Sequence, residues 1–162
     1  MIFLCDYYNQ ASKDLAYSLQ VAGYDATTVV INPDGFLPQD ALSPFTYYVE
    51  AEEETGKPRF FNQVPVPAFW EISGNNQMAR VSNLTEERAR ITYPEGSKAR
   101  IVKSVEWLDK TGKIRQVDHY NKYGFCFAKT THDENGQAVF TSYQTKKVTS
   151  AFWKIISLVI YS

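Results

Sequence analysis

Two short motifs of the same kind, Asp109-Lys-Thr-Gly112 and Asp133-Glu-Asn-Gly136, most constrain the fold of this chain. In each motif the aspartate can accept hydrogen bonds from the backbone two residues on, and the glycine supplies the positive φ that closes a hairpin loop. An aromatic residue follows each glycine at nearly the same distance along the chain. Residues 101–143 therefore predict four strands joined by tight turns, which is a β-meander.

The region before this stretch continues the same pattern. Residues 58–100 hold short strand-like runs separated by turn residues, and we expect about seven or eight antiparallel strands after residue 58. Pro65 and Pro67 cannot donate to a ladder, so their segment is an edge strand or an extended entry into the sheet. The aromatic share of 15% suits such a sheet, because flat rings cover cross-strand neighbours.

The beginning of the chain follows a different pattern. Two apolar runs, residues 2–5 and 27–31, flank a segment with apolar residues at helical spacing that ends at Gly23. Strand, helix and strand in so short a stretch form a βαβ unit with parallel strands. The first turn lacks the glycines that bind phosphate in dinucleotide-binding folds.

These patterns predict an α+β fold that is mainly β. We expect a short Rossmann-like βαβ fragment at residues 1–31, followed by an extended antiparallel β-meander sheet as a domain at residues 32–145. Residues 146–162 form an apolar tail that is too short to span a bilayer. No signal peptide opens the chain, which favours a cytoplasmic location, including a peripheral one on the inner face of the membrane.

The composition argues against several kinds of function. A net charge of −1 gives no electrostatic reason to expect nucleic acid as a partner. With two histidines and two distant cysteines, no catalytic or metal-ligand spacing can be assembled, and no nucleotide-binding motif is present. We therefore expect no catalytic residues, no metal site, no cofactor and no enzyme activity of the chain's own.

Aromatic residues of the sheet are the remaining candidates for binding. Such amphipathic side chains suit a sugar or peptide platform, and they also suit a core. An open meander further offers edges and faces on which another chain can dock. The candidates for binding an acceptor or a partner are Trp70, Trp107, His119, Tyr120 and Tyr123.

Four segments together point to a family. The four segments start with LCDYYNQASKDL, DGFLPQDALSPF, GKPRFFNQVPVP and RIVKSVEWLDKT. The most specific piece is VEWLDKTGKIRQVDHYNKYGF, which lies within the fourth segment. The chain resembles, over roughly residues 1–145, the N-terminal part of the non-catalytic glycosylation chaperones of the accessory Sec system in Gram-positive bacteria. The resemblance implies a Rossmann-like start with an inserted antiparallel sheet that meets a catalytic glycosyltransferase and helps to hold the acceptor.

The resemblance also implies a function. Together with its catalytic glycosyltransferase, such a protein adds N-acetylglucosamine from UDP-N-acetylglucosamine to Ser/Thr of serine-rich repeat adhesins. The alternatives are a glycosyltransferase fragment that binds a nucleotide sugar and a carbohydrate-binding β-module. Because residues 146–162 do not match the family, we expect a truncated chain whose apolar tail favours self-association.

Overall fold

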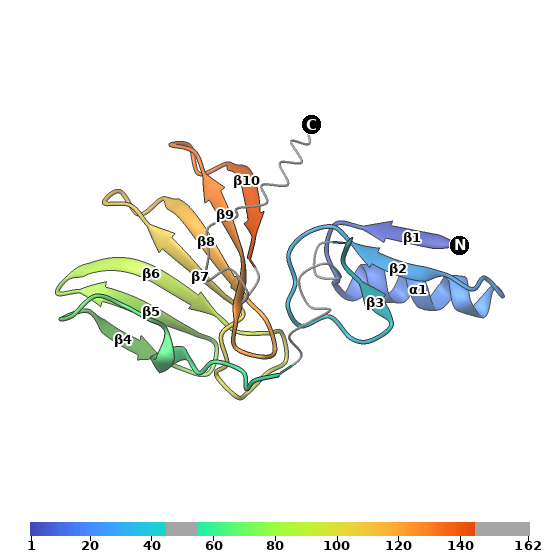
Figure 1. The fold of residues 1–162 in the computed structure, drawn as a ribbon, viewed down its shortest axis with the longest axis horizontal. Helices are drawn as coiled ribbons and strands as arrows, with labels where there is room; N and C mark the ends of the chain where they lie inside the picture. Colours follow the sequence, from blue (N-terminus) through green and yellow to red (C-terminus); the bar gives the residue numbers. More distant parts are fainter. Residues whose placement is uncertain (45–54, 145–162) are drawn as a thin grey trace.

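The computed structural model describes residues 1–44 and 55–144. Within these residues it contains a small parallel sheet near the N-terminus and a larger antiparallel sheet after it (Figure 1). The predicted fold class, mainly β with a short Rossmann-like start, is confirmed. A strand considered for residues 45–49 and the apolar tail at 146–162 lie outside the described residues.

The N-terminal region is the predicted βαβ unit with one added strand. It consists of β1 (Ile2–Cys5), α1 (Gln10–Val21), β2 (Thr27–Val30) and β3 (Ala41–Leu42), in the sheet order β1-β2-β3. Both strand pairs are parallel, with Ile2 opposite Thr27 in the first. The sequence pattern missed β3, because a strand of two residues close to prolines has no periodicity to detect.

Local side-chain chemistry sets the ends of α1. Asn9 is the N-cap, and its side-chain oxygen accepts a hydrogen bond from the Ser12 backbone N–H at 3.0 Å. The Ser12 hydroxyl accepts the N–H of Asn9 in return at 2.9 Å, which completes a capping box. Gly23, with φ of 83°, follows the helix and stops it as predicted.

The apolar side of α1 is not buried. Leu15 is 49% exposed, and Ala11, which lies at helical spacing from it, is also exposed. On β1, Ile2 and Leu4 are exposed as well. The unit has its predicted backbone but leaves much of its apolar surface in solvent.

The second region is a meander of seven strands, as predicted. In chain order the strands are β4 (Glu71–Gly74), β5 (Met78–Asn83), β6 (Glu86–Thr92), β7 (Ser104–Leu108), β8 (Ile114–Tyr120), β9 (Cys126–His132) and β10 (Ala138–Tyr143). Each strand pairs antiparallel with the next along the chain, so β4 and β10 form the two edges (Figure 1).

The two Asp-Gly motifs form the turns that they predicted. The Asp109 carboxylate accepts hydrogen bonds from the backbone N–H groups of Thr111 at 2.8 Å and Lys113 at 3.1 Å. Asp133 does the same for Asn135 and Gln137, both at 2.8 Å. Gly112 and Gly136 both adopt φ of 82°, the left-handed conformation that closes each loop.

One face of the meander carries the main core. Its centre consists of small and β-branched residues on β5, β6 and β7, with Val81, Ile91 and Val105 at 0% exposure. The segment before β4, which includes a short 3-10 helix, η1 (Phe61–Gln63), covers this face and contributes Val64. Because the covering segment belongs to the same region, the meander supplies both layers of its own core.

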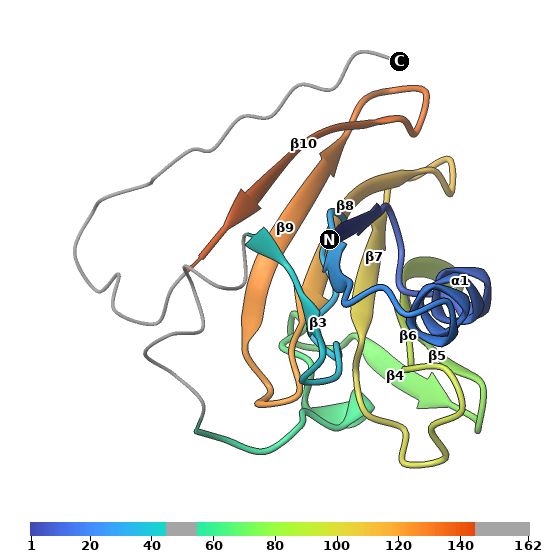
Figure 2. The same cartoon turned by 90° about the vertical axis from the view of Figure 1, so that its right-hand side faces the viewer.

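A short junction joins the two regions. Gly35 forms an isolated parallel bridge with Asn121, and its carbonyl accepts the Lys122 N–H at 2.9 Å. Nearby, the Lys103 ammonium lies 3.0 Å from the Asp34 carboxylate. These contacts hold the three-stranded unit in front of one face of the meander (Figure 2).

No helix in residues 1–44 or 55–144 is long and apolar enough to cross a membrane. The peripheral membrane location stays a prediction.

Candidate functional site

The two faces of the meander differ in chemistry. Residues directly opposite each other on paired strands have their side chains on the same face of the sheet. The strand register therefore tells on which of the two faces each side chain lies. Val81, Ala89 and Trp107 are opposite one another on what we call the core face. Arg80, Arg90, Glu106, Val117 and Thr130 follow each other across the opposite face, which we call the polar face.

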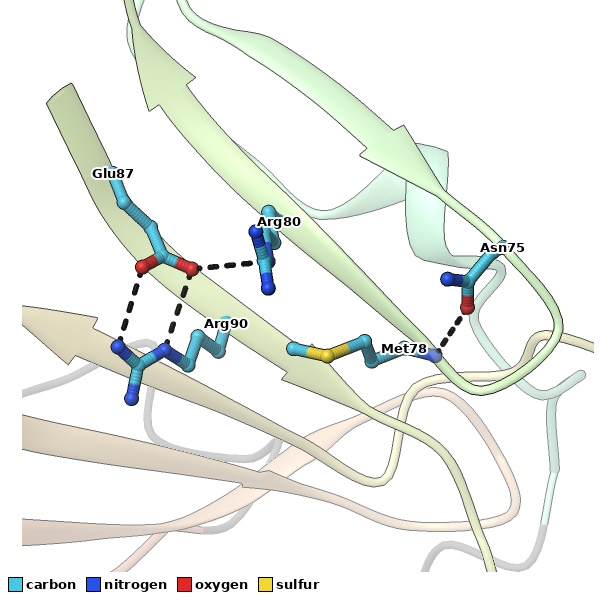
Figure 3. A network of polar contacts seen from close by, with 5 residues as sticks. All are labelled: Asn75, Met78, Arg80, Glu87 and Arg90. Carbon is cyan, nitrogen blue, oxygen red and sulfur yellow. Dashed lines mark hydrogen bonds and ion pairs between the residues drawn. The ribbon is translucent and has the colours of Figure 1, made fainter. Parts of the chain in front are cut away.

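The polar face begins with an ion-pair network on β5 and β6. The Glu87 carboxylate lies 3.4 Å from the guanidinium of Arg80 and 3.2 Å from that of Arg90 (Figure 3). Arg90 donates to both carboxylate oxygens, a bidentate geometry that fixes both side chains. Hydrogen bonding to Glu87 raises the pKa of Arg90 above its ordinary value. This network sets two guanidinium groups against one carboxylate, so this end of the face keeps an excess of positive charge.

Hydroxyl groups and one histidine continue the face. The Thr92 and Ser104 hydroxyl oxygens lie 2.6 Å apart. His119 Nε2 lies 2.8 Å from the Thr130 hydroxyl, which in turn lies 2.9 Å from the Thr141 hydroxyl. Burial lowers the pKa of His119 from 6.5 to about 4, so its imidazole is neutral at pH 7.

A cleft separates this face from the strand ends of the small sheet. It has a volume of about 260 Å³, and it lies where β1 and β2 end. The residues that matter most for its chemistry are Tyr8, Asp34, Lys103, Ser104, Glu106 and His119. Ligands of open α/β sheets bind outside the carboxyl ends of the strands, which is where this cleft lies.

The charges in the cleft favour an uncharged ligand. The carboxylates of Asp34 and Glu106 line it, and the ammonium of Lys103 is paired with Asp34. Among the described residues that line the cleft, an anion such as a diphosphate would therefore meet the Glu106 carboxylate beside an ammonium that is already paired. Hydroxyl, imidazole and carboxylate groups instead suit a neutral ligand that donates and accepts hydrogen bonds.

A second hollow lies on the core face near β8 and β9. It has a volume of about 370 Å³ and is lined by Arg59, Trp107, Asp118, Tyr120 and Lys129 among others. The Asp118 carboxylate accepts hydrogen bonds from Trp107 Nε1 at 2.8 Å and from Gln116 Nε2 at 2.6 Å. Burial raises the pKa of Tyr120 to about 12, so its hydroxyl stays protonated.

The structure divides the five predicted binding residues among different places. His119 lines the cleft, whereas Trp107 and Tyr120 line the hollow on the opposite face. Trp70 packs against the core, with the Arg88 guanidinium 5.9 Å from its ring centre. Tyr123 lies in the β8–β9 turn beneath the Lys122 ammonium. Their binding role stays a prediction.

Several residues of the cleft were not among the candidates. Glu106, Ser104 and Thr92 alternate with core residues on their strands, so their common face could have been inferred from the period of two. The ion pair between Asp34 and Lys103 could not be inferred in this way, because it joins residues of two different regions and no local sequence pattern relates them. Among the described residues, no group of three or more His, Cys, Asp or Glu side chains could hold a metal ion.

Comparison with known proteins identifies both regions. The GtfB N-terminal domain family matches residues 2–48, and the GtfB middle domain family matches residues 70–154. A stabilising protein of a UDP-N-acetylglucosamine–peptide N-acetylglucosaminyltransferase, GtfB of Streptococcus gordonii, is 54% identical over 88% of this chain and 32% of its own. Its counterpart in Streptococcus pneumoniae serotype 4 is 53% identical over 89% of this chain and 32% of its own.

The fold agrees with a solved relative. A chain in the crystal structure of the GtfA/B complex bound to UDP and GlcNAc is 53% identical and superimposes with a TM-score of 0.74. The match covers 90% of this chain and 33% of that one, so the present chain spans about a third of the length of the relatives that it matches. Because the GtfB middle domain family matches more than half of the chain, the chain belongs to the GtfB family.

Proposed function

We propose that this chain is a non-catalytic stabilising and acceptor-binding module of a protein O-glycosylation complex. The complex adds N-acetylglucosamine to Ser/Thr of serine-rich repeat adhesins, and a partner transferase performs the catalysis. The observation that carries the proposal is the 53% identity, over 90% of this chain, to a chain of the GtfA/B complex.

The charge of the cleft supports binding of the nucleotide sugar by the partner transferase and not by this chain. The nucleotide sugar carries a diphosphate, which the Glu106 carboxylate would repel in this cleft, while the Lys103 ammonium is already paired with Asp34. The first turn after β1 also lacks the glycines of a phosphate-binding loop. Donor binding and transfer are therefore assigned to the partner.

The acceptor matches the cleft better than the donor does. A Ser/Thr-rich polypeptide is uncharged, and its hydroxyls both donate and accept hydrogen bonds. The Glu106 carboxylate can accept from such a hydroxyl, and the neutral imidazole of His119 lines the same cleft. We place the acceptor against the polar face of the meander for this reason.

Co-purification with the GtfA transferase of the source organism tests the stabilising role. We expect a stable complex, both with the full chain and with a chain that ends before residue 146, because the meander carries the contact. Absence of a complex in both cases would contradict the proposal. Loss of the complex with the shorter chain alone would move the contact to residues 146–162.

Binding of a fluorescent Ser/Thr-rich peptide tests the acceptor role. The Glu106→Ala substitution should weaken binding about tenfold, since it removes a charged hydrogen-bond acceptor. Lys129→Gln is the matched control, because Lys129 lines the hollow on the other face. A loss of binding in the control and not in Glu106→Ala would contradict the placement of the acceptor in the cleft.

The hollow on the core face favours glycan binding as a second candidate function. Trp107 and Tyr120 line it together with the hydrogen-bonded Asp118, and amphipathic rings with a few fixed polar groups are typical of small-molecule sites. Titration with N-acetylglucosamine, followed by tryptophan fluorescence, distinguishes this function. A signal that disappears in Trp107→Leu would favour it.

A further inference from the structure

The hollow on the core face has an excess of positive charge. Among the described residues that line it, Arg59 and Lys129 are cationic, Asp118 is anionic, and the others are uncharged at pH 7. Two cations against one carboxylate leave one positive charge without a counterpart. The cleft on the polar face differs, because its one ammonium is paired with Asp34 and the Glu106 carboxylate remains. The two places therefore favour ligands of different charge.

The single carboxylate of the hollow is already engaged. Asp118 Oδ2 accepts a hydrogen bond from Trp107 Nε1 at 2.8 Å, and Oδ1 accepts one from Gln116 Nε2 at 2.6 Å. Lys129 is opposite Asp118 in the strand register, yet within residues 1–44 and 55–144 no ion pair joins the two. Asp118 is also only 8% exposed. A ligand in the hollow therefore meets donors and cations rather than an accepting carboxylate.

Contacts within the chain fix Arg59 at one side of the hollow. Its Nε donates to the Gly124 carbonyl at 3.2 Å, and its Nη1 donates to the Gln63 carbonyl at 2.8 Å. The guanidinium also lies 5.5 Å from the centre of the Tyr120 ring. Carbonyl oxygens and a ring are neutral, so these contacts orient the guanidinium without cancelling its charge. A guanidinium has further N–H donors, and one that is already held in place loses little entropy when it binds a carboxylate.

The thiol of Cys126 shows that the two cations act on the same place. Burial raises the pKa of this thiol to about 12, and the Asp118 carboxylate raises it too, whereas Lys129 and Arg59 both lower it. Arg59 comes before β4 and Lys129 lies on β9, so the fold brings them together from distant parts of the sequence. The thiol itself stays protonated at pH 7 and adds no negative charge.

The rest of the lining is apolar or amphipathic. Pro65, Trp107 and Phe125 line the hollow, and burial keeps the pKa of Tyr120 at about 12, so that its hydroxyl can donate. The volume of about 370 Å³ is within the usual range of small-molecule sites. Apolar walls with a few fixed polar groups are also typical of such sites. This lining suits a ligand with one ring and a single negative group.

We propose that the hollow on the core face is a binding site for a small monocarboxylate built on one ring, with the carboxylate held by Arg59 and Lys129. A single negative charge matches the single excess cation, whereas a dianion would meet the Asp118 carboxylate without a further cation to offset it. Acidic sugars and aromatic acids share this chemistry. The site goes beyond the proposed function, because neither GtfA nor the acceptor takes part in it.

Calorimetric titration of the full chain with two matched pairs of ligands tests the site. Glucuronate has a carboxylate where glucose has a hydroxymethyl group, and benzoate has one where benzamide has an amide. At least one acid should bind, and it should bind at least tenfold more tightly than its neutral counterpart. The pair that responds tells whether the ligand is a sugar or an aromatic acid. N-acetylglucosamine is neutral and should bind more weakly than that acid.

Substitution of the two cations tests how the carboxylate is held. Lys129→Gln should weaken binding of the acid about tenfold, because it removes a charged donor. Lys110→Gln is the matched control, since it removes the same charge from an exposed residue in the β7–β8 turn. Arg59→Gln should weaken binding at least as much as Lys129→Gln. Its unfolding temperature is measured alongside, because Arg59 also bonds two carbonyls of the chain, and Lys129→Gln alone decides if Arg59→Gln does not fold.

Each result decides for or against the site. Absence of binding by both acids, or equal binding by each acid and its neutral counterpart, would overturn it. So would an equal loss in Lys110→Gln and Lys129→Gln, since the attraction would then be general. Tighter binding of glucose 6-phosphate than of glucuronate would exclude a monocarboxylate sugar, and tighter binding of N-acetylglucosamine than of either acid would leave only the neutral glycan. A chain that fails these tests and still forms the complex with GtfA would leave the proposed function intact.

Discussion

The small parallel unit and the meander are built from equally clear patterns, yet they bury their residues very differently. In the unit, Ile2 and Leu4 of β1 are 72% and 60% exposed, whereas Ile91 and Val105 of the meander are fully buried. The meander has a covering segment from its own sequence, while parallel sheets normally need cover on both faces. An amphipathic pattern thus predicts an element, and a second layer decides whether the element contributes to a core.

The largest expected effect comes from truncation of a core residue in the meander. Ile91→Ala should lower the free energy of unfolding by about 3 to 4 kcal/mol, because it removes a fully buried side chain and leaves a cavity. Urea titration measures the change. Leu4→Ser in the small unit is the contrast and should change the same quantity by less than about 0.5 kcal/mol. Equal losses would mean that both regions share one core.

A substitution at the junction tests how far the small unit depends on the meander. A Cβ at position 35 would overlap the backbone of Asn121, so Gly35→Ala should cost about 2 to 3 kcal/mol. Amide exchange localises the effect: the Lys122 N–H, which bonds to Gly35, should exchange faster, and the Ile91 N–H should not change. Gly96→Ala is a reference for backbone strain without a clash, because no atom lies near its added Cβ but its φ is 73°; it should cost about 1 to 2 kcal/mol and leave the exchange of the Lys122 N–H unchanged. Faster amide exchange throughout β6 would contradict the expectation that the small unit can be destabilised without the meander.

Acid should lower the stability of the folded state, because His119 becomes protonated on unfolding. The pKa of His119 is about 4 in the folded state and about 6.5 when unfolded, so the unfolded chain binds more protons between these values. Stability is then lost as the pH falls from about 6.5 towards 4, by about 2 kcal/mol at pH 5. Urea midpoints at pH 7 and pH 5 measure this, and His119→Gln should remove that part of the difference. An unchanged pH dependence in the variant would assign the effect to other groups.

The smallest effect is expected at the hairpin turns. Asp133→Ala removes a carboxylate that accepts two backbone N–H groups in an exposed turn, and should cost about 1 kcal/mol. Asp109→Ala should cost slightly more, because Asp109 accepts the corresponding two backbone bonds and also the Thr111 hydroxyl at 2.7 Å. Thermal unfolding of the two variants checks this order. A larger loss in Asp133→Ala would mean that the second hairpin has support beyond its turn.

Local chemistry explains which parts of the fold were predictable. The Asp-Gly turns, the glycine after α1 and the parallel pairing of β1 with β2 follow from short-range rules, and all were predicted. The positive φ of Leu84 was not, because leucine carries no signal for that conformation. The exposure of Leu15 was not predictable either, because spacing identifies an apolar side and not what covers it.

The candidate site was less accessible to sequence reasoning. His119 and Tyr120 are neighbours in a strand, and the period of two places them on opposite faces, so no single aromatic surface can contain both. A bulge between β8 and β9 then brings Phe127 close to the His119 ring, with ring centres 6.5 Å apart. The cleft itself depends on how two regions meet, which no local pattern describes.

The junction at Gly35 has a consequence for how members of this family can diverge. The obstacle to a larger residue there is the main chain at residues 120 and 121, which no exchange of side chains can remove. Point mutations at Asn121 therefore cannot rescue a change at position 35, and a selection for suppressors should return insertions or deletions in the β8–β9 turn. We expect glycine at this position in homologues that keep the length of that turn, and variation only where the length differs.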